Sequence, residues 1–231
     1  MKTSSSLLSI SAAAILLAVG PAQAVIIDNF EDGDTTLTLT GAAVGDARNV
    51  SQTGLSGVLG GDRDIAMALV DLDPADASSI SITEVSGGAL SVLTKNTDNV
   101  TVTVDWTGMT DFDLTQNNAT GIYLSTYGKI NNNVEITMTL NGVATQMLVG
   151  ASGFSGDFFF PFADFIGGAG GLLEARSINS IQMVLSDGLA WDAAFDLIET
   201  RESFRPAPVP GTLALLGLGL GALGRRRFRR T

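Results

Sequence analysis

The sequence predicts an all-β fold: a single β-sandwich with jelly-roll-like connections, flanked by an N-terminal signal helix and a C-terminal transmembrane helix. Short stretches alternate between apolar and polar residues with a period of two, and Gly, Asn and Asp separate them. Long amphipathic helical stretches are missing. The composition changes near both ends, which predicts three parts: residues 1–24, 25–203 and 204–231.

The first part has the pattern of a secretory signal peptide. Lys2 precedes an apolar stretch from Leu7 to Val19, and Ala22 and Ala24 form the small-x-small pattern of a cleavage site. We therefore predict export through the Sec machinery across the inner membrane, with cleavage after Ala24. An uncleaved anchor helix is the alternative.

The middle part contains the predicted strands. In residues 100–106, Val100, Val102, Val104 and Trp106 share one face, so Trp106 is expected in the core. The same pattern, with an apolar face in the core and a polar face in water, marks residues 36–40, 79–83 and 134–140. Further strands are expected over residues 25–30, 63–72, 89–94, 121–127, 143–149, 157–160, 180–186 and 191–198. Residues 25–203 are thus expected to form one domain of about eleven strands.

Two local features complete the predicted domain. The dipeptide Asn141-Gly142 between two strand-like runs predicts a tight hairpin turn. At most one or two helical turns are expected between Gly171 and Arg176.

Composition and charge exclude several functional classes. The chain has no Cys and no His, which removes thiolate and imidazole chemistry, including Ser-His-Asp and Cys-His catalysis. Between Lys2 and the five arginines near the C-terminus lie 24 acidic and seven basic residues, a net charge of −17. Such a charge repels nucleic acid and suits hydrated matrices or divalent cations. We therefore expect neither an enzyme nor a nucleic-acid-binding protein.

The C-terminal part combines a proline-rich break, an apolar helix and a basic end. The break is Pro208, Val209, Pro210 and Gly211; the transmembrane helix is predicted over residues 209–224; and Arg225, Arg226 and Arg227 follow it. The arginines are expected to stay cytoplasmic, which leaves the acidic middle outside. A plain tail anchor is the alternative.

About the last 25 residues resemble the PEP-CTERM sorting signal of Gram-negative, exopolysaccharide-producing bacteria. The family's central Glu is Val209 here, a departure that bears on processing. The resemblance implies that an exosortase is a partner, that the helix holds the chain in the membrane before processing, and that the protein then reaches the cell surface, the outer membrane or the extracellular matrix. The same signature is also labelled the C-terminal segment of ice-binding proteins, a label that concerns the tail alone.

A second resemblance concerns the middle part. Residues 25–33 resemble the opening strand of jelly-roll carbohydrate-binding and galactose-binding-like domains, and residues 181–185 and 196–198 resemble their closing strands. Residues 60–64, Gly-Gly-Asp-Arg-Asp, are similar to a segment of PEP-CTERM passenger domains. The resemblance implies a β-sandwich that binds sugars.

Three residues are candidates for contact with a sugar. Tyr123 and Tyr127 are predicted to share one strand face on either side of Ser125, where flat rings can stack on sugar rings. Arg63, between two aspartates, could bind a ligand carboxylate or hydroxyl; a local ion pair is the alternative.

Acidic residues near the first and last strands predict a calcium site. These strands are commonly close in a jelly roll, which could bring Asp28, Glu31 and Asp196 together. Carboxylate oxygens are the ligands that calcium prefers. A solvated acidic rim is the alternative interpretation.

The sequence favours a non-enzymatic surface or matrix protein associated with exopolysaccharide or biofilm. The alternative is a calcium-dependent carbohydrate-binding module. Less favoured are a glycosidase, which would use carboxylates among Asp105, Asp111, Asp113 and Glu135, and an ice-binding protein.

Overall fold

The computed structural model describes residues 24–40, 43–72, 80–94, 98–186 and 190–203. Apart from Ala24, the predicted signal peptide, the sorting signal and the predicted transmembrane helix lie outside these residues. In the part of the chain that the structure describes, no helix is both long and apolar enough to cross a membrane.

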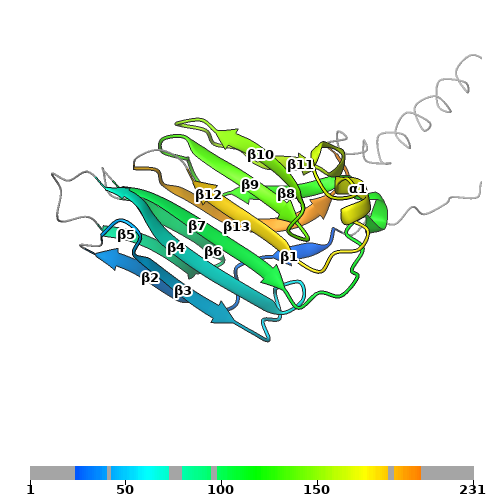
Figure 1. Cartoon of the computed structure of the whole chain (residues 1–231), viewed down its shortest axis with the longest axis horizontal. Coiled ribbons are helices and arrows are strands. Elements are labelled where there is room, and N and C mark those ends of the chain that lie inside the picture. The colour runs from blue at the N-terminus through cyan, green and yellow to red at the C-terminus, as the bar shows by residue number, and fades with distance from the viewer. Residues whose placement is uncertain (1–23, 41–42, 73–79, 95–97, 187–189, 204–231) are drawn as a thin grey trace, which may run out of the picture.

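The described residues form thirteen strands, which makes the fold nearly all β (Figure 1). The strands are β1 (Ile26–Asp28), β2 (Thr35–Thr40), β3 (Ala47–Gln52), β4 (Asp62–Leu72), β5 (Ile80–Ser86), β6 (Ala89–Thr94), β7 (Asp98–Thr107), β8 (Gly121–Thr126), β9 (Val134–Leu140), β10 (Ala144–Gly150), β11 (Phe158–Pro161), β12 (Ile181–Ser186) and β13 (Ala193–Arg201). Short helices occupy Gln116–Asn118 (η1), Phe162–Asp164 (η2) and Gly171–Glu174 (α1). The predicted helical turn after Gly171 is confirmed.

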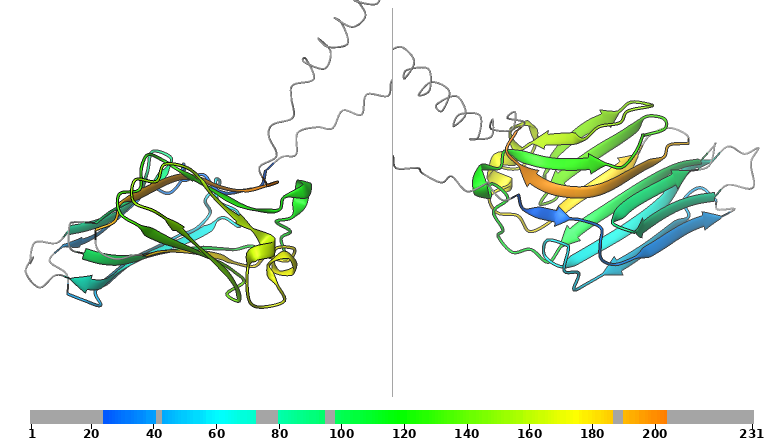
Figure 2. Two further views of the ribbon diagram at one scale, coloured as in Figure 1. Left: turned by 90° about the horizontal axis from the view of Figure 1, so that it is seen from above. Right: turned by 180° about the vertical axis from the view of Figure 1, so that it is seen from behind.

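The strands form two antiparallel sheets that face one another as layers (Figure 2). The seven-stranded sheet has the order β11-β8-β13-β6-β5-β2, and β1 also pairs with β13. The six-stranded sheet has the order β10-β9-β12-β7-β4-β3. Consecutive strands cross repeatedly from one sheet to the other, so the core is enclosed by segments distant in the sequence.

One hydrophobic cluster fills the space between the sheets. Val100, Val102, Val104 and Trp106 of β7 are all 0% exposed, which confirms the predicted core face of this strand and the core position of Trp106. The apolar positions of β9 are fully buried in the same way. Alternation with a period of two therefore predicted these two central strands correctly, because one face of each is excluded from water.

The predicted hairpin turn joins β9 to β10. The Val143 N–H donates to the Leu140 carbonyl at 3.0 Å, and strand pairing resumes at Leu140 and Ala144. Asn141 and Gly142 have φ of 52° and 70°, as a type I′ turn requires at both central positions. The prediction is confirmed.

Two predictions about strands are wrong. The sequence analysis missed β3, because this edge strand is mostly exposed and lacks an apolar alternation. In β5 the predicted phase is inverted: Ser81 and Thr83 are 0% and 1% exposed, whereas Ile80 is 40% exposed. Val85 at the end of this strand lies in the core, and the pleat of the strand therefore turns Ser81 and Thr83 inward with it.

Polar partners in the core accommodate the inverted phase. Ser81 Oγ donates to Asp98 Oδ2 at 2.9 Å, and Thr83 Oγ1 lies 3.2 Å from Met67 Sδ. Asp98 is 1% exposed, and its second oxygen, Oδ1, has no hydrogen-bond partner among the described residues. A buried acceptor without a partner destabilises the fold.

The described ends of the chain lie side by side. The Val25 N–H donates to Thr200 Oγ1 at 3.1 Å, and the Thr200 N–H donates to the Val25 carbonyl at 2.8 Å. Both described ends are therefore on the same side of the molecule, the right-hand side of Figure 1.

We predict that Asp98→Asn stabilises the protein by about 1 kcal/mol, because the amide keeps an acceptor for Ser81 and cannot carry a buried negative charge. Urea unfolding of the full-length protein measures the change. Ser81→Ala is the matched variant and should destabilise by about 1–3 kcal/mol, since it removes the hydroxyl bonded to Asp98. A clear loss of stability in Asp98→Asn would contradict the prediction.

Candidate functional site

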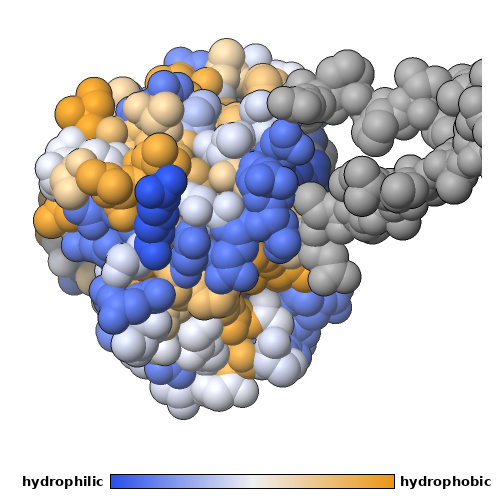
Figure 3. All heavy atoms as spheres, turned by 90° about the vertical axis from the view of Figure 1, so that its right-hand side faces the viewer, coloured by the Kyte–Doolittle hydropathy of each residue, from blue (hydrophilic) through white to orange (hydrophobic). Residues whose placement is uncertain are grey.

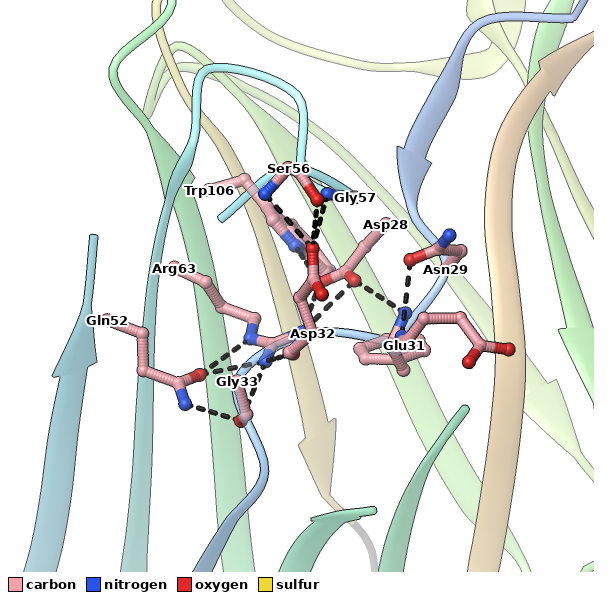
Figure 4. Close-up of polar contacts among 11 residues, drawn as sticks. Asp28, Asn29, Glu31, Asp32, Gly33, Gln52, Ser56, Gly57, Arg63 and Trp106 are labelled. Atoms are coloured by element: carbon pink, nitrogen blue, oxygen red, sulfur yellow. Dashed lines mark hydrogen bonds and ion pairs between the residues drawn. The ribbon is translucent and has the colours of Figure 1, made fainter. Parts of the chain in front are cut away.

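Arg63 and Asp28 form an ion pair inside the sandwich (Figure 4). Arg63 Nη1 lies 2.8 Å from Asp28 Oδ2, and both side chains are 0% exposed. The Trp106 indole N–H and the Phe30 N–H also donate to the Asp28 carboxylate, each at 2.8 Å. Because β1 carries Asp28 while β4 and β7 carry Arg63 and Trp106, the pair joins the two sheets through the core.

The remaining donors of Arg63 are bonded within the protein. Its Nε and Nη2 donate to Gln52 Oε1 at 3.0 and 2.8 Å, and Nη2 also donates to the Asp32 carbonyl at 2.8 Å. The guanidinium carbon lies 5.5 Å from the centre of the Phe30 ring. The structure thus places Arg63 in an ion pair, but with Asp28 of β1 rather than with a neighbouring aspartate, and leaves no exposed part of it to meet a ligand.

Asp32 holds the loop before β4 in place. Its Oδ2 accepts the Gly57 N–H at 3.0 Å, the Ser56 N–H at 3.1 Å and the Ser56 hydroxyl. These hydrogen bonds stabilise the charged form and hold the pKa of Asp32 below its usual value. At Asp28, burial raises the pKa of the carboxyl, and the charge of Arg63 and the Trp106 hydrogen bond oppose that rise.

The three predicted calcium ligands do not converge. β1 pairs with β13 as expected, and Asp28 lies opposite Ile198, which faces the core. Asp196 is half-buried and lies where the register between β13 and β8 is irregular. Glu31 lies against Gly88, where an added Cβ would be 2.7 Å from Glu31 Oε1. Among the described residues, no group of three or more acidic side chains could hold a metal ion.

The second candidate region is the outer face of the seven-stranded sheet, the face turned away from the core. Ile122 and Leu124 of β8 are 0% exposed and point into the core, so Tyr123 and Tyr127 point outward, as predicted. Their exposure differs sharply: Tyr127 is 69% exposed and Tyr123 is 6% exposed. The Tyr127 N–H donates to the Ala194 carbonyl at 2.8 Å, which extends the ladder beyond β8.

Other side chains cover Tyr123. The Arg201 guanidinium carbon lies 3.5 Å from the centre of the Tyr123 ring, and Arg201 Nε donates to Glu199. The Tyr123 hydroxyl donates to Asp157. Burial raises the pKa of Tyr123, and its hydrogen bond to Asp157 raises it further.

Apolar residues extend the outer face toward the opposite edge of the sheet. Leu93 of β6 is 56% exposed and lies directly opposite Ile82 of β5, which lies opposite Thr38 of β2. Sequence reasoning assigned the isoleucines of β5 to the core and therefore missed this surface. Val85 and Leu90 could have identified it. Both are 0% exposed, and alternation counted from Val85 turns Ile82 outward, just as alternation counted from Leu90 turns Leu93 outward.

A shallow depression of about 290 Å³ lies beside Arg201. It is lined by Ala24, Gln116, Asn117, Ala119, Thr200, Arg201 and Glu202. Figure 3 views the side of the molecule on which both described chain ends lie; hydrophilic residues form a band across it, with hydrophobic residues on both sides. Sequence reasoning did not identify Arg201 or Asp157. Arg201 lies on β13 and Asp157 lies just before β11, and these two strands come close only because β8 pairs with both of them.

No protein-family model matches the chain, and no curated protein matches it. Among solved structures, the chain is similar to the family 11 carbohydrate-binding module of the cellulase Lic26A-Cel5E of Clostridium thermocellum, at 13% identity over 80% of this chain and 98% of that one, with a TM-score of 0.39. A family 11 module from the same organism, in complex with a β-1,3-1,4-mixed-linked tetrasaccharide, matches at 14% identity over 77% and 94%, with a TM-score of 0.38. PfGH50B matches at 13% identity and a TM-score of 0.38 over 54% of this chain, which spans only 22% of PfGH50B. These are distant likenesses of architecture.

We predict that Arg63→Met destabilises the protein by about 3–5 kcal/mol, because it leaves the Asp28 carboxylate buried without its counter-charge. Asp28→Asn should cost less, because Arg63 keeps its bonds to Gln52 and to main-chain carbonyls. Chemical unfolding of both variants gives the two free energies. A larger loss of unfolding free energy in Asp28→Asn than in Arg63→Met would contradict the prediction.

The depressed pKa of Asp32 predicts a dependence of stability on acid. Its contribution is fully present above the unfolded-state pKa and is lost as the pH falls through the lower folded-state pKa. Asp32→Asn should therefore lower the melting temperature at neutral pH and reduce its fall on acidification. Thermal unfolding from neutral to strongly acidic pH measures this; parallel curves for the two proteins would refute it.

Proposed function

We propose that this protein is an exported, non-enzymatic, carbohydrate-binding protein that contacts neutral polysaccharide with the outer face of its seven-stranded sheet. The observation that carries the proposal is Tyr127, an aromatic side chain left 69% exposed at the end of β8. A large exposed aromatic ring on a rigid sheet offers a flat surface for a sugar ring, and burying it from water is favourable.

The surroundings of Tyr127 support an extended ligand. Tyr123 lies four residues away on the same face, about 13 Å along an extended strand. Ser125 lies between them and Leu93 lies on β6, so polar and apolar groups share the face. A polymer that follows β8 from Tyr127 would pass over Ser125 toward Tyr123.

The charge of the chain favours a neutral polymer. Between Lys2 and the five C-terminal arginines, the 24 acidic residues outweigh the seven basic ones by 17, so an acidic polysaccharide would be repelled at long range. Calcium is not needed for this binding mode, because stacking and hydrogen bonding to hydroxyl groups use no metal.

Three of the four carboxylates considered for catalysis accept hydrogen bonds within the protein. Asp105 accepts a hydrogen bond from Gln182 at 2.8 Å, Asp111 accepts one from Ser177 at 2.7 Å, and Asp113 accepts the Thr115 N–H at 2.7 Å. These bonds support a structural role for the three residues and a binding role for the protein.

Delivery to the surface is the second element of the proposal. The C-terminal residues resemble the PEP-CTERM signal, and we propose that exosortase processing near Pro208 releases the jelly-roll-like sandwich to the cell surface or to an exopolysaccharide matrix. The described ends lie together at Val25 and Thr200, so the outer face of the sheet extends away from the point of attachment.

We predict that Tyr127→Ala weakens binding to a neutral polysaccharide at least about tenfold, a loss of about 1.4 kcal/mol, without changing stability. Affinity electrophoresis of the full-length protein in gels that contain mixed-linkage β-glucan or the producing strain's exopolysaccharide measures it. Met147→Ala is the control, because Met147 is 54% exposed on the other sheet. Equal retardation of both variants and the unmodified protein would refute the site.

A further inference from the structure

Tyr123 is buried although it points away from the core. Its neighbours along β8, Ile122 and Leu124, fill the core at 0% exposure, and Tyr123 lies on the opposite face at 6% exposure. In the sheet it stands between Phe159 of β11 and Glu199 of β13. Since the core does not bury this ring, side chains on the outer face must cover it.

Arg201 stacks on the Tyr123 ring. Its guanidinium carbon is 3.5 Å from the centre of the Tyr123 ring, and its Nε donates to Glu199. The side chain of Arg201 remains 41% exposed, whereas that of Glu199 is 10% exposed. A stack and an ion pair of this exposure are each weak, because water screens and competes with both.

The Tyr123 ring is held independently of its cover. Its hydroxyl donates to Asp157, whose other oxygen accepts the Thr126 N–H at 3.1 Å. The Thr126 hydroxyl in turn donates to the Gly156 carbonyl. The ring should therefore keep its orientation when Arg201 moves, which is the property of a pre-organised stacking surface.

The arginine has room to move. Arg201 also lines the depression of about 290 Å³, together with Gln116, Asn117 and Glu202. These residues offer amide and carboxylate oxygens to a guanidinium group. Displacement would thus exchange one set of polar contacts of Arg201 for another, and it would leave the Glu199 carboxylate, whose side chain is 10% exposed, without its ion pair.

We propose that Arg201 is a displaceable cover over a cryptic sugar-stacking ring, Tyr123, and that a neutral hexose polymer bound at Tyr127 displaces it. This inference rests on the proposed function. A sugar ring presents C–H groups to an aromatic face and would occupy the position where the guanidinium now stacks. Arginine and sugar therefore compete for Tyr123, and the site lengthens along β8 when the sugar prevails.

The first test measures the cover without any sugar. Arg201→Ala should make Tyr123 several times more reactive toward tetranitromethane, which modifies exposed tyrosine rings, while Tyr127 in the same protein serves as the exposed reference. Mass spectrometry of the digested full-length protein locates the modification. Arg176→Ala, which removes an exposed arginine that does not stack on Tyr123, should leave the reactivity of Tyr123 unchanged.

The second test measures binding of mixed-linkage β-glucan by isothermal titration calorimetry. Arg201→Ala should bind about tenfold more tightly than the unmodified protein, and Arg201→Ala with Tyr123→Ala should lose that gain. Circular dichroism and thermal unfolding confirm that both variants are folded.

The outcomes separate the two proposals. If the unmodified protein binds and Arg201→Ala binds equally or more weakly, the cover is overturned while the proposed function stands. If the unmodified protein binds and Arg201→Ala binds about tenfold more tightly, both are supported. If only Arg201→Ala binds, the polymer does not displace Arg201, and the displacement is overturned. If no variant binds the glucan or the native exopolysaccharide, the proposed function fails and the sugar-stacking role of Tyr123 fails with it, whatever the nitration result.

Discussion

The buried pair of Asp28 and Arg63 is the interaction on which the rest of the structure depends. Two charges removed from water destabilise a fold unless every donor and acceptor is bonded. Here β1 brings the carboxylate, β4 brings the guanidinium, and Trp106 on β7 donates the additional hydrogen bond. Satisfying the pair therefore determines how the two sheets are positioned at this end of the sandwich.

The same requirement shapes the loops around the pair. Gly33 has a φ of 76°, and a Cβ there would lie 2.9 Å from Arg63 Nη2. At Gly57 a Cβ would lie 2.3 Å from Asn29 Oδ1. The loop after β1 and the loop before β4 can approach this closely only because both positions are glycine.

Acidic residues in this protein act mainly as acceptors for its own backbone and side chains. Asp32 accepts donors from a neighbouring loop, Asp157 holds Tyr123 and Thr126, and Asp192 accepts the Thr94 N–H at 2.9 Å. The predicted calcium site assumed that the acids of the first and last strands would be free to meet. The pairing of the strands was anticipated, but the register of β1 is irregular between Ile26 and Asp28, and Asp28 is buried against Arg63.

The outer face of the seven-stranded sheet shows what a local pattern can and cannot predict. Alternation around Ile122 and Leu124 was enough to place both tyrosines on one outward face. The same alternation failed at β5, where Ser81 and Thr83 could be buried because Asp98 and Met67 approach them from the other sheet. Within β5, only Val85 indicated the correct phase.

The sequence by itself determined the all-β class, the core faces of β7 and β9, the turn at Asn141 and the unusual charge, because each depends on neighbouring residues or on composition alone. Only the tertiary structure decided that Arg63 is a buried partner of Asp28 and that Arg201 covers Tyr123. Both contacts join strands that are distant in the chain and adjacent in space. Their geometry arises from the order and the register of the strands. Alternation of apolar and polar residues along one strand predicts neither of these.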